Sequence, residues 1–326
     1  MNDPIFLFSV IKFVISTFLA FACMSLMLRL SMWVFKIKNS RLRACLRLVP
    51  LVCVFLDAFL NGAKGGHWLN PLDCSSCLQK WLLSLLPQAV QSQLQEEQLS
   101  LISWMAQQFP LLGLKVVVLA ILGVTIWKVV QACTELYFGE KFLKQLLAVA
   151  VPAQRQLQKV VLPKNVRLLF SEDCSIPFAA KNRYIVVSPS LLEGLGNEQF
   201  ECIIAHELEH LCWKDPLLRT FCHFAEACLW WIPLKSWLRQ MEEEQEEACD
   251  QAIVHYHLEA SDLATAILKT SQGKNMSYSY CCSLAAHHSL RRVQALFHGS
   301  NVDSPSLLAC LTGIGLGVLL IISCLI

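Results

Sequence analysis

Long apolar segments constrain the fold of this 326-residue chain more than any other feature of its sequence. An apolar helix of about 20 residues is long enough to cross a lipid bilayer. Four segments are candidates: residues 5–35, 48–61, 110–132 and 306–326. Only 16% of all residues are charged, and Asp57, in the shortest segment, is the only acid in these four. We therefore expect a membrane protein with about four transmembrane helices.

The basic residues give the expected orientation. The first apolar segment is followed by five basic residues with no acid among them: Lys36, Lys38, Arg41, Arg43 and Arg47. Short cytoplasmic loops carry an excess of Lys and Arg. We therefore expect an outer loop at residues 62–109 and a cytoplasmic domain at 134–305. The protein would then be a multi-pass protein of the cell inner (plasma) membrane, in contact with the lipid bilayer.

Charge and cysteine content argue against two other classes of protein. A net charge of +2, without a run of Lys or Arg, gives no reason to expect direct nucleic acid binding. The sixteen cysteines are scattered through apolar stretches, where they serve as small hydrophobic residues rather than as a disulfide framework. Cys74 and Cys77 are the exception, because their spacing in the outer loop would allow a disulfide between them.

The expected cytoplasmic domain has about 170 residues, which is enough for a core of its own. Val166–Phe170 and Tyr184–Val187 are short apolar runs typical of strands. Residues 176–180 between them contain Pro177, which favours a short edge strand. From Ser188 onward the pattern is helical. The predicted fold class is thus an α+β membrane protein, mostly helical, whose cytoplasmic domain contains a small β-sheet.

A His-Glu-x-x-His sequence at His206, Glu207 and His210 lies in this helical part. On a helix, residues four apart share a face, so both imidazoles can bind one metal ion. Glu207 follows the first histidine and can act as a general base on a water molecule at that ion. The same five-residue pattern also occurs by chance, with two ordinary surface histidines. The presence of a third ligand would therefore distinguish a metal site from a chance match.

Glu246 is the candidate for that third ligand, 36 residues after His210. Two histidines and one glutamate form a common zinc-binding set in catalytic sites. The apolar helix expected at Leu217–Ile232, the break at Pro233 and a returning helix would form a hairpin that brings Glu246 back. Asp250, one turn further on, can accept a hydrogen bond from a ligand histidine.

The other acids near Glu246 are expected to lie in solvent, on the exposed face of the returning helix. These are Glu242, Glu243, Glu244 and Glu247. The apolar helix before Pro233 contains Arg219, His223 and Glu226, and its successor is acidic, so we expect it to pack beside the membrane spans rather than cross the bilayer.

These residues resemble a known family, the BlaR/MecR-type integral-membrane zinc metallopeptidases, which are gluzincins. The resemblance rests on five stretches of sequence: residues 177–179, residues 185–189, the His-Glu-x-x-His motif, Lys214–Asp215, and Glu246 followed by Ala-Cys-Asp at 248–250. It implies zinc as cofactor, bound by His206, His210 and Glu246, with Glu207 as the catalytic base. It also implies that an extended substrate can add to the edge strand at 176–180.

The substrate is expected to be a protein or peptide. A cytoplasmic site near the membrane suggests cytosolic regulators, the chain itself or segments of membrane proteins, and the resemblance favours a transcriptional repressor. Antibiotic-sensing members carry a penicillin-binding sensor after the last span, and this sequence has none, so antibiotic sensing does not carry over. Two alternatives remain. One is a quality-control protease of the HtpX/Ste24 type, and the other is a non-catalytic membrane scaffold with a structural zinc site.

The donor that would stabilise the oxyanion in such an enzyme is left open by the sequence. The candidates are His255, Tyr256, His257, His287, His288 and Arg291. Asp215, five residues after His210, is expected to cap or orient the motif helix rather than to take part in the chemistry.

Overall fold

The structure is a computed structural model that describes residues 4–63, 111–153, 157–174, 176–181, 183–272 and 292–296. The predicted last span at 306–326 and the cysteines at 74 and 77 lie outside the described residues.

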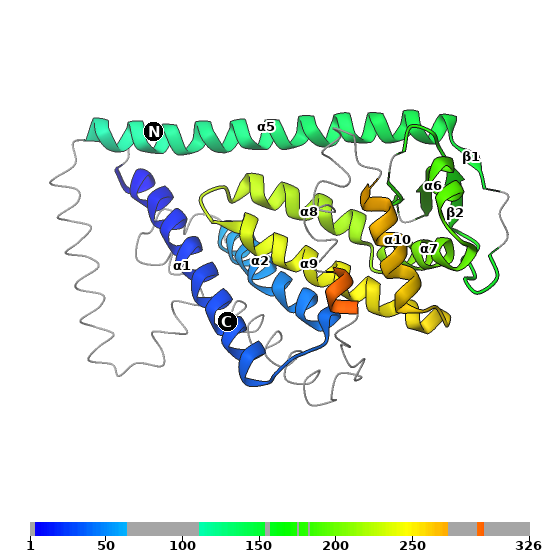
Figure 1. The fold of residues 1–326 in the computed structure, drawn as a ribbon. Coiled ribbons are helices and arrows are strands. Elements are labelled where there is room, and N and C mark those ends of the chain that lie inside the picture. Colours follow the sequence, from blue (N-terminus) through cyan, green and yellow to red (C-terminus); the bar gives the residue numbers. More distant parts are fainter. Residues whose placement is uncertain are drawn as a thin grey trace.

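Three long helices account for the described residues of the N-terminal part: α1 (Pro4–Val34), α2 (Ser40–Ala63) and α5 (Leu111–Val149). α5 runs along one side of the whole molecule in Figure 1, and α1 and α2 lie below it. Among the described residues, two helical segments are long and apolar enough to cross a membrane, Phe13–Val34 and Lys115–Val149.

Two of these helices extend beyond the spans that the sequence predicts. α5 contains residues 111–132 of the predicted span 110–132 but continues without a break to Val149, so the expected boundary between membrane region and cytoplasmic domain falls inside one helix. α2 contains the predicted span 48–61 but starts at Ser40, so its first half carries three of the arginines assigned to a loop. The side chain of Asn39 accepts a hydrogen bond from the Leu42 N–H at 2.9 Å, which caps this earlier start.

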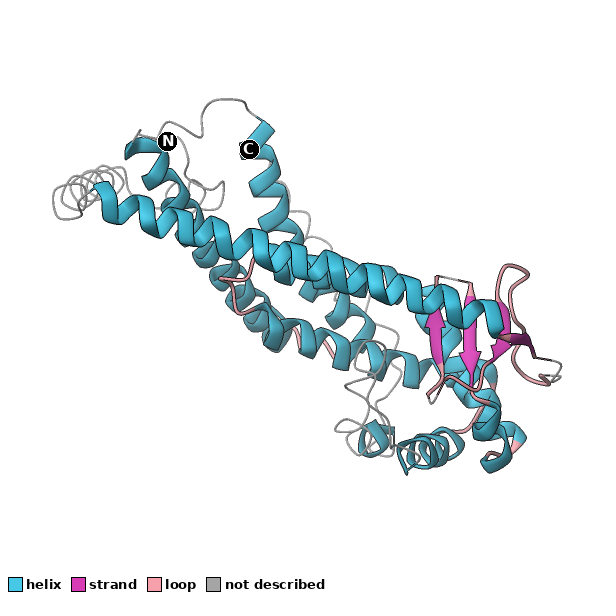
Figure 2. Ribbon diagram, turned by 90° about the horizontal axis from the view of Figure 1, so that it is seen from above, coloured by secondary structure: helices cyan, strands magenta, loops and turns pink. Residues whose placement is uncertain are grey.

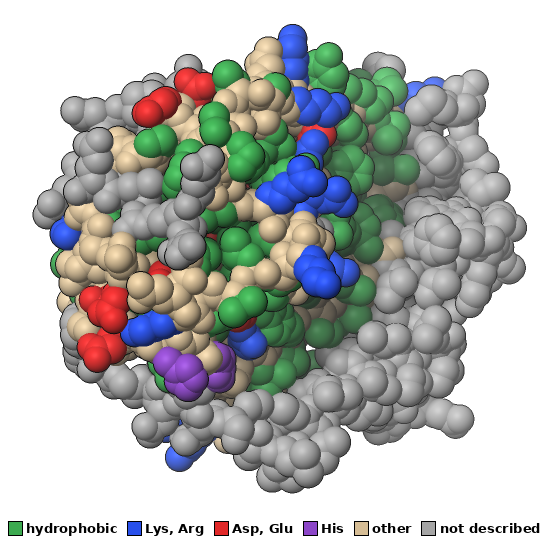
Figure 3. All heavy atoms as spheres, turned by 90° about the vertical axis from the view of Figure 1, so that its right-hand side faces the viewer, with side chains coloured by type: hydrophobic (Ala, Val, Ile, Leu, Met, Phe, Trp, Pro, Cys, Tyr) green, Lys and Arg blue, Asp and Glu red, His purple; other side chains and the backbone are tan. Residues whose placement is uncertain are grey.

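A four-stranded sheet follows at the end of α5, as Figure 2 shows. Its strands are β1 (Val151–Pro152), β2 (Arg167–Phe170), β3 (Phe178–Ala180) and β4 (Tyr184–Val187), in the order β1-β2-β4-β3. β2 and β4 are parallel, with Leu168 opposite Ile185, and β3 pairs antiparallel with β4 at one edge. The small sheet and its edge strand agree with the prediction. Figure 3 looks onto this end of the molecule, where basic side chains gather among apolar ones.

Five α-helices and one short 3₁₀ helix then complete the described domain. They are α6 (Pro189–Gly194), α7 (Asn197–Cys212), α8 (Asp215–Cys228), α9 (Leu234–Ala252), η2 (Ile253–Tyr256) and α10 (Ala260–Gln272). α7 is the central element, since every residue from Phe200 to Leu211 is buried. It packs against the sheet, α9 and α10. Glu201 fixes the position of α7 by accepting hydrogen bonds from the backbone N–H groups of residues 158–160 at 2.7–3.1 Å.

α8 and α9 form the helical hairpin that the sequence predicts, with Pro233 at the turn. α8 packs against α5 and α9 packs against α2. At the α8–α5 contact, His223 Nε2 lies 3.0 Å from Glu135 Oε2. Just after α8, the Trp230 indole N–H donates to the Thr125 hydroxyl at 3.0 Å. The domain and the long helices therefore share extensive contacts.

Candidate metal centre

The two motif histidines lie on one face of α7 and are buried, each 6% exposed. Their Nε2 atoms are 3.1 Å apart. The α8–α9 hairpin brings Glu246 to the same point, with Oε2 3.4 Å from His206 Nε2 and Oε1 3.5 Å from His210 Nε2. The ligand atoms of all three residues lie within 4.8 Å of one another. The structure thus brings together the three residues that the sequence nominated.

These separations fit a zinc ion. Zinc binds imidazole nitrogen and carboxylate oxygen at about 2.0–2.2 Å with tetrahedral geometry, which places neighbouring ligand atoms about 3.3 Å apart. The observed separations of 3.1, 3.4 and 3.5 Å lie close to this value. Among the described residues, no fourth His, Cys, Asp or Glu joins this group. The arrangement therefore matches a three-ligand site that leaves one position for water or substrate.

Each histidine also has a carboxylate on its other ring nitrogen. Asp250 Oδ1 lies 3.0 Å from His206 Nδ1, and Asp215 Oδ2 lies 2.6 Å from His210 Nδ1. A carboxylate at Nδ1 favours the tautomer with its proton there, which leaves the Nε2 lone pair free for a metal. Asp250 was nominated for this position. Asp215, which we expected to cap or orient the helix, contacts the second histidine directly.

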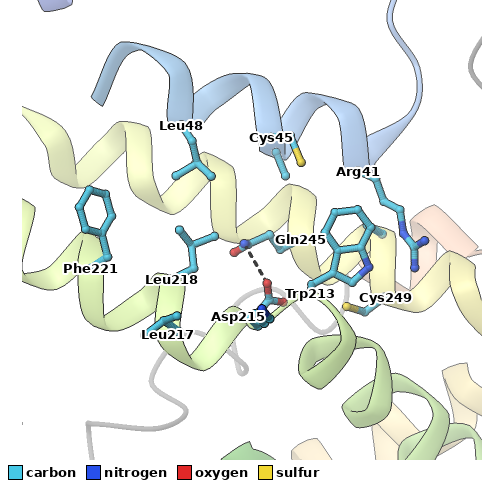
Figure 4. Close-up of a pocket in the computed structure, with 13 residues that line it drawn as sticks. Arg41, Cys45, Leu48, Trp213, Asp215, Leu217, Leu218, Phe221, Gln245 and Cys249 are labelled. Atoms are coloured by element: carbon cyan, nitrogen blue, oxygen red, sulfur yellow. Dashed lines mark hydrogen bonds between the residues drawn. The ribbon is translucent and has the colours of Figure 1, made fainter. Parts of the chain in front are cut away.

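The turn between α7 and α8 explains how Asp215 reaches His210. Lys214 adopts a left-handed backbone conformation with φ of 57°, which is uncommon for a residue with a side chain and reverses the chain sharply. Asp215 therefore points back at α7 instead of away from it. Gln245 of α9 donates to Asp215 Oδ1 at 3.2 Å, as drawn in Figure 4, and holds the carboxylate from the opposite side.

Arg292 is a residue of this centre that sequence reasoning missed. Its Nε and Nη2 atoms donate to Asp250 at 2.8 and 2.6 Å, and its Nη1 lies 3.0 Å from Glu246 Oε2. Nη2 also lies 3.3 Å from His206 Nε2. The candidates that the sequence offered for the oxyanion donor included Arg291 but not Arg292. Nothing in the local pattern separates the two neighbouring arginines, because the distinction depends on which one faces α9.

Arg292 determines the charge state of the two acids. Burial by itself would raise the pKa of Glu246, but the charges of Arg292 and then His210 outweigh it and hold that pKa well below its ordinary value. Burial would likewise raise the pKa of Asp250, and Arg292 again keeps it lower than usual. Both carboxylates are therefore ionised at neutral pH and available as a metal ligand and as a hydrogen-bond acceptor.

The expectation that four neighbouring glutamates face solvent is wrong for Glu244. This residue is 7% exposed, and its carboxylate accepts hydrogen bonds from Arg47 Nε and Nη2 at 2.6 and 3.0 Å. Glu247, partly buried, accepts one from Arg43 Nη2 at 3.0 Å. The physical reason is that the arginines lie on α2, distant in sequence, and cover this face of α9.

The other residues considered for the site lie in different surroundings. Glu207 is buried on α7 beside the histidines, as a base in the site would be. Tyr256 donates its hydroxyl hydrogen to Glu209 Oε1 at 3.0 Å, and His255 and His257 are exposed. His287, His288 and Arg291 lie outside the described residues. Arg219, one turn after Asp215, has its Nη2 3.1 Å from Glu246 Oε1 and is a second basic residue that the sequence did not single out.

Comparison with known proteins agrees with this geometry. A search of curated proteins gave no significant match. The family described as BlaR1 peptidase M56 matches residues 75–296, about two thirds of the chain, and this range contains all three candidate ligands. Members of that family are membrane-associated metallopeptidases. With the match covering the helices that carry the site, this chain belongs to the BlaR1 peptidase family M56.

Proposed function

We propose that this protein is an integral-membrane, zinc-dependent endopeptidase whose metal ligands are His206, His210 and Glu246. The observation that carries the proposal is the arrangement of the two imidazoles. Both Nε2 atoms point at one position shared with Glu246, and both Nδ1 atoms face carboxylates. The two Nε2 atoms lie 3.1 Å apart, which suits either a shared proton or one metal ion bound by both imidazoles. Because the Glu246 carboxylate reaches the same position, a zinc ion accounts for all three groups.

Glu207 is the proposed general base. Bound zinc lowers the pKa of water and polarises a scissile carbonyl. Glu207 follows His206 on α7, so its carboxylate takes the proton of the attacking water and passes it to the leaving amine. Burial of Glu207 keeps this exchange away from bulk solvent. Asp215 and Asp250 keep the two imidazoles in the orientation that binding requires.

The proposed substrate is a regulatory protein, such as a transcriptional repressor, or the chain itself, cleaved on the cytoplasmic side of the inner (plasma) membrane. β3 supports an extended substrate, because it is the last strand of the sheet and pairs with β4 on one side. A peptide can add to the other side of such a strand through backbone hydrogen bonds. β3 also packs against α7, which carries Glu207.

A purely structural zinc site fits the described residues less well. Closing the coordination sphere requires a fourth protein ligand. Cys249 is the nearest thiol, but its Sγ lies 3.5 Å from His210 Nδ1, on the side of the ring away from the shared position. The thiol of Cys202 faces the Glu259 carbonyl oxygen at 3.8 Å. Neither thiol is placed to be the fourth ligand of a zinc ion bound by His206, His210 and Glu246.

The test compares the wild type with Glu207→Gln, both purified as full chains in detergent. Zinc content is measured by elemental analysis, and cleavage is followed on casein and on the chain itself. Glu198→Gln is the matched control, because Glu198 lies on the same helix with its side chain 61% exposed. We expect zinc in all three proteins and cleavage by the wild type and the control alone. Absence of zinc from the wild type, or equal cleavage by Glu207→Gln, would overturn the proposal.

A further inference from the structure

α9 presents acids on two different faces. Glu246 and Asp250, four residues apart, face the candidate metal centre. Glu244 and Glu247, three residues apart, face α2 instead. Residues three or four apart share a helix face, whereas neighbours one or two apart do not. One helix therefore carries a metal ligand on one side and an ion-pairing surface on the other.

Two arginines of α2 bind the face of α9 that carries Glu244 and Glu247. Arg47 and Glu244 form a buried ion pair through two hydrogen bonds, which fix both the distance and the angle between the groups. Arg43 bridges the two acids, with Nη2 3.0 Å from Glu247 Oε2 and Nε 3.4 Å from Glu244 Oε1. Trp237 adds a further bond, since its indole N–H donates to the Arg47 carbonyl at 2.7 Å.

α2 also contacts the helix that carries both histidines. Arg41 forms an ion pair with Glu209 of α7 and lies over the Trp213 ring, 4.5 Å from its centroid. Glu209 is the residue just before His210. The first two turns of α2 thus bind next to metal ligands on both α7 and α9.

We propose that Arg43 and Arg47 are positioning residues of the metal centre, which keep Glu246 within reach of His206 and His210 by holding α9 against α2. The inference rests on the proposed function and adds to it the residues that position one of the three ligands. Metal ligands must be placed to within about 0.2 Å. A shift of α2 relative to α7 would therefore change how well the three ligands share one ion.

A cavity beside this contact leaves room for such a shift. It has a volume of ≈ 570 Å³ and lies between the first half of α2 and the start of α8 (Figure 4). Its lining is mainly apolar and includes Ala44, Leu48, Leu217, Leu218 and Phe221. Asp215 and Cys249, which contact His210, also border it. The cavity thus borders both α2 and two residues that contact His210.

The test replaces both residues of the Arg47–Glu244 pair together. It uses the full chain, purified in detergent. Removing Arg47 alone would leave the buried Glu244 carboxylate with only its longer contact to Arg43, at 3.4 Å, whereas Arg47→Met with Glu244→Leu removes both charges of the pair. We expect the double variant to melt near the wild-type temperature but to bind zinc about tenfold more weakly in competition with a chelator. kcat on casein should fall in parallel while KM stays unchanged.

Two further variants make the result decisive. Lys144→Met with Glu140→Leu removes an exposed ion pair on α5, and it should leave zinc affinity and cleavage as in the wild type. Arg43→Met with Glu247→Leu removes the neighbouring ion pair between α2 and α9 and should also weaken zinc binding. This second double variant also supplies the answer if the first one does not fold. Absence of zinc from the wild type would contradict the proposed function. A wild type that binds zinc, together with unchanged zinc affinity and kcat in the double variants of the α2–α9 pairs, would overturn the positioning role.

Discussion

The Nδ1 atom of His210 lies 2.6 Å from Asp215 Oδ2, and this short contact depends on the left-handed turn at Lys214. Removal of the negative charge should weaken metal binding, because the carboxylate fixes the tautomer of the imidazole and raises its basicity. We expect Asp215→Asn to lower zinc affinity about 10- to 100-fold, measured by competition with a chelator. Asp262→Asn, on α10, is the control. Wild-type affinity in Asp215→Asn would show that the contact has no such role.

Arg292 should matter more to the metal-free protein than to the zinc-bound one. Without metal, Arg292 is the cation within 3.0 Å of both Glu246 and Asp250. Removal of one partner from a buried ion pair costs about 3–5 kcal/mol, because a charge is left unpaired. Zinc supplies a replacement positive charge.

We therefore expect Arg292→Ala to lower the melting temperature strongly in EDTA and much less in excess zinc. Thermal unfolding of the full chain under both conditions is the measurement, and Arg292→Lys should give an intermediate result in EDTA. Equal destabilisation with and without zinc would mean that Arg292 serves only to pack residues 292–296 against α9.

Thiol reactivity tests the burial of α7. Burial raises the pKa of Cys202 to about 12, so the reactive thiolate is nearly absent at pH 8. Because deprotonation becomes appreciable only as pH approaches the raised pKa, the folded protein should resist alkylation at Cys202 throughout pH 7–9. Iodoacetamide labelling followed by peptide mass spectrometry should find Cys202 modified only after denaturation. Cys212, exposed at the end of the same helix, should react in the native state. Native labelling of Cys202 would contradict the central position of α7.

Local patterns in the sequence were enough to predict much of the domain. The apolar runs at Val166–Phe170 and Tyr184–Val187 contain the strands β2 and β4, and Pro233 does mark the turn of the hairpin. The four-residue spacing of the motif histidines, together with that hairpin, was sufficient to nominate Glu246. In each case the signal lies within one element or in a single residue that breaks it.

Contacts between distant elements left no such signal. The arginines of α2 were assigned to a membrane-flanking loop, and Glu244 was assigned to solvent, although Arg47 and Glu244 form one buried pair. Each side chain alone is typical of an exposed residue. Arg292 was missed for the same reason, since its contacts with Asp250 and Glu246 depend on packing that no local spacing encodes.

X-ray absorption at the zinc edge of the purified wild-type protein tests the central claim most directly. Zinc–nitrogen and zinc–oxygen distances of about 2.0–2.2 Å differ clearly from zinc–sulfur distances of about 2.3 Å. The account predicts one zinc per chain, with scattering from two imidazoles and light atoms and none from sulfur. Replacement of Glu246 by Ala should remove one light-atom ligand or the metal itself. A sulfur ligand, or a wild-type protein without zinc, would contradict a three-ligand centre formed by His206, His210 and Glu246.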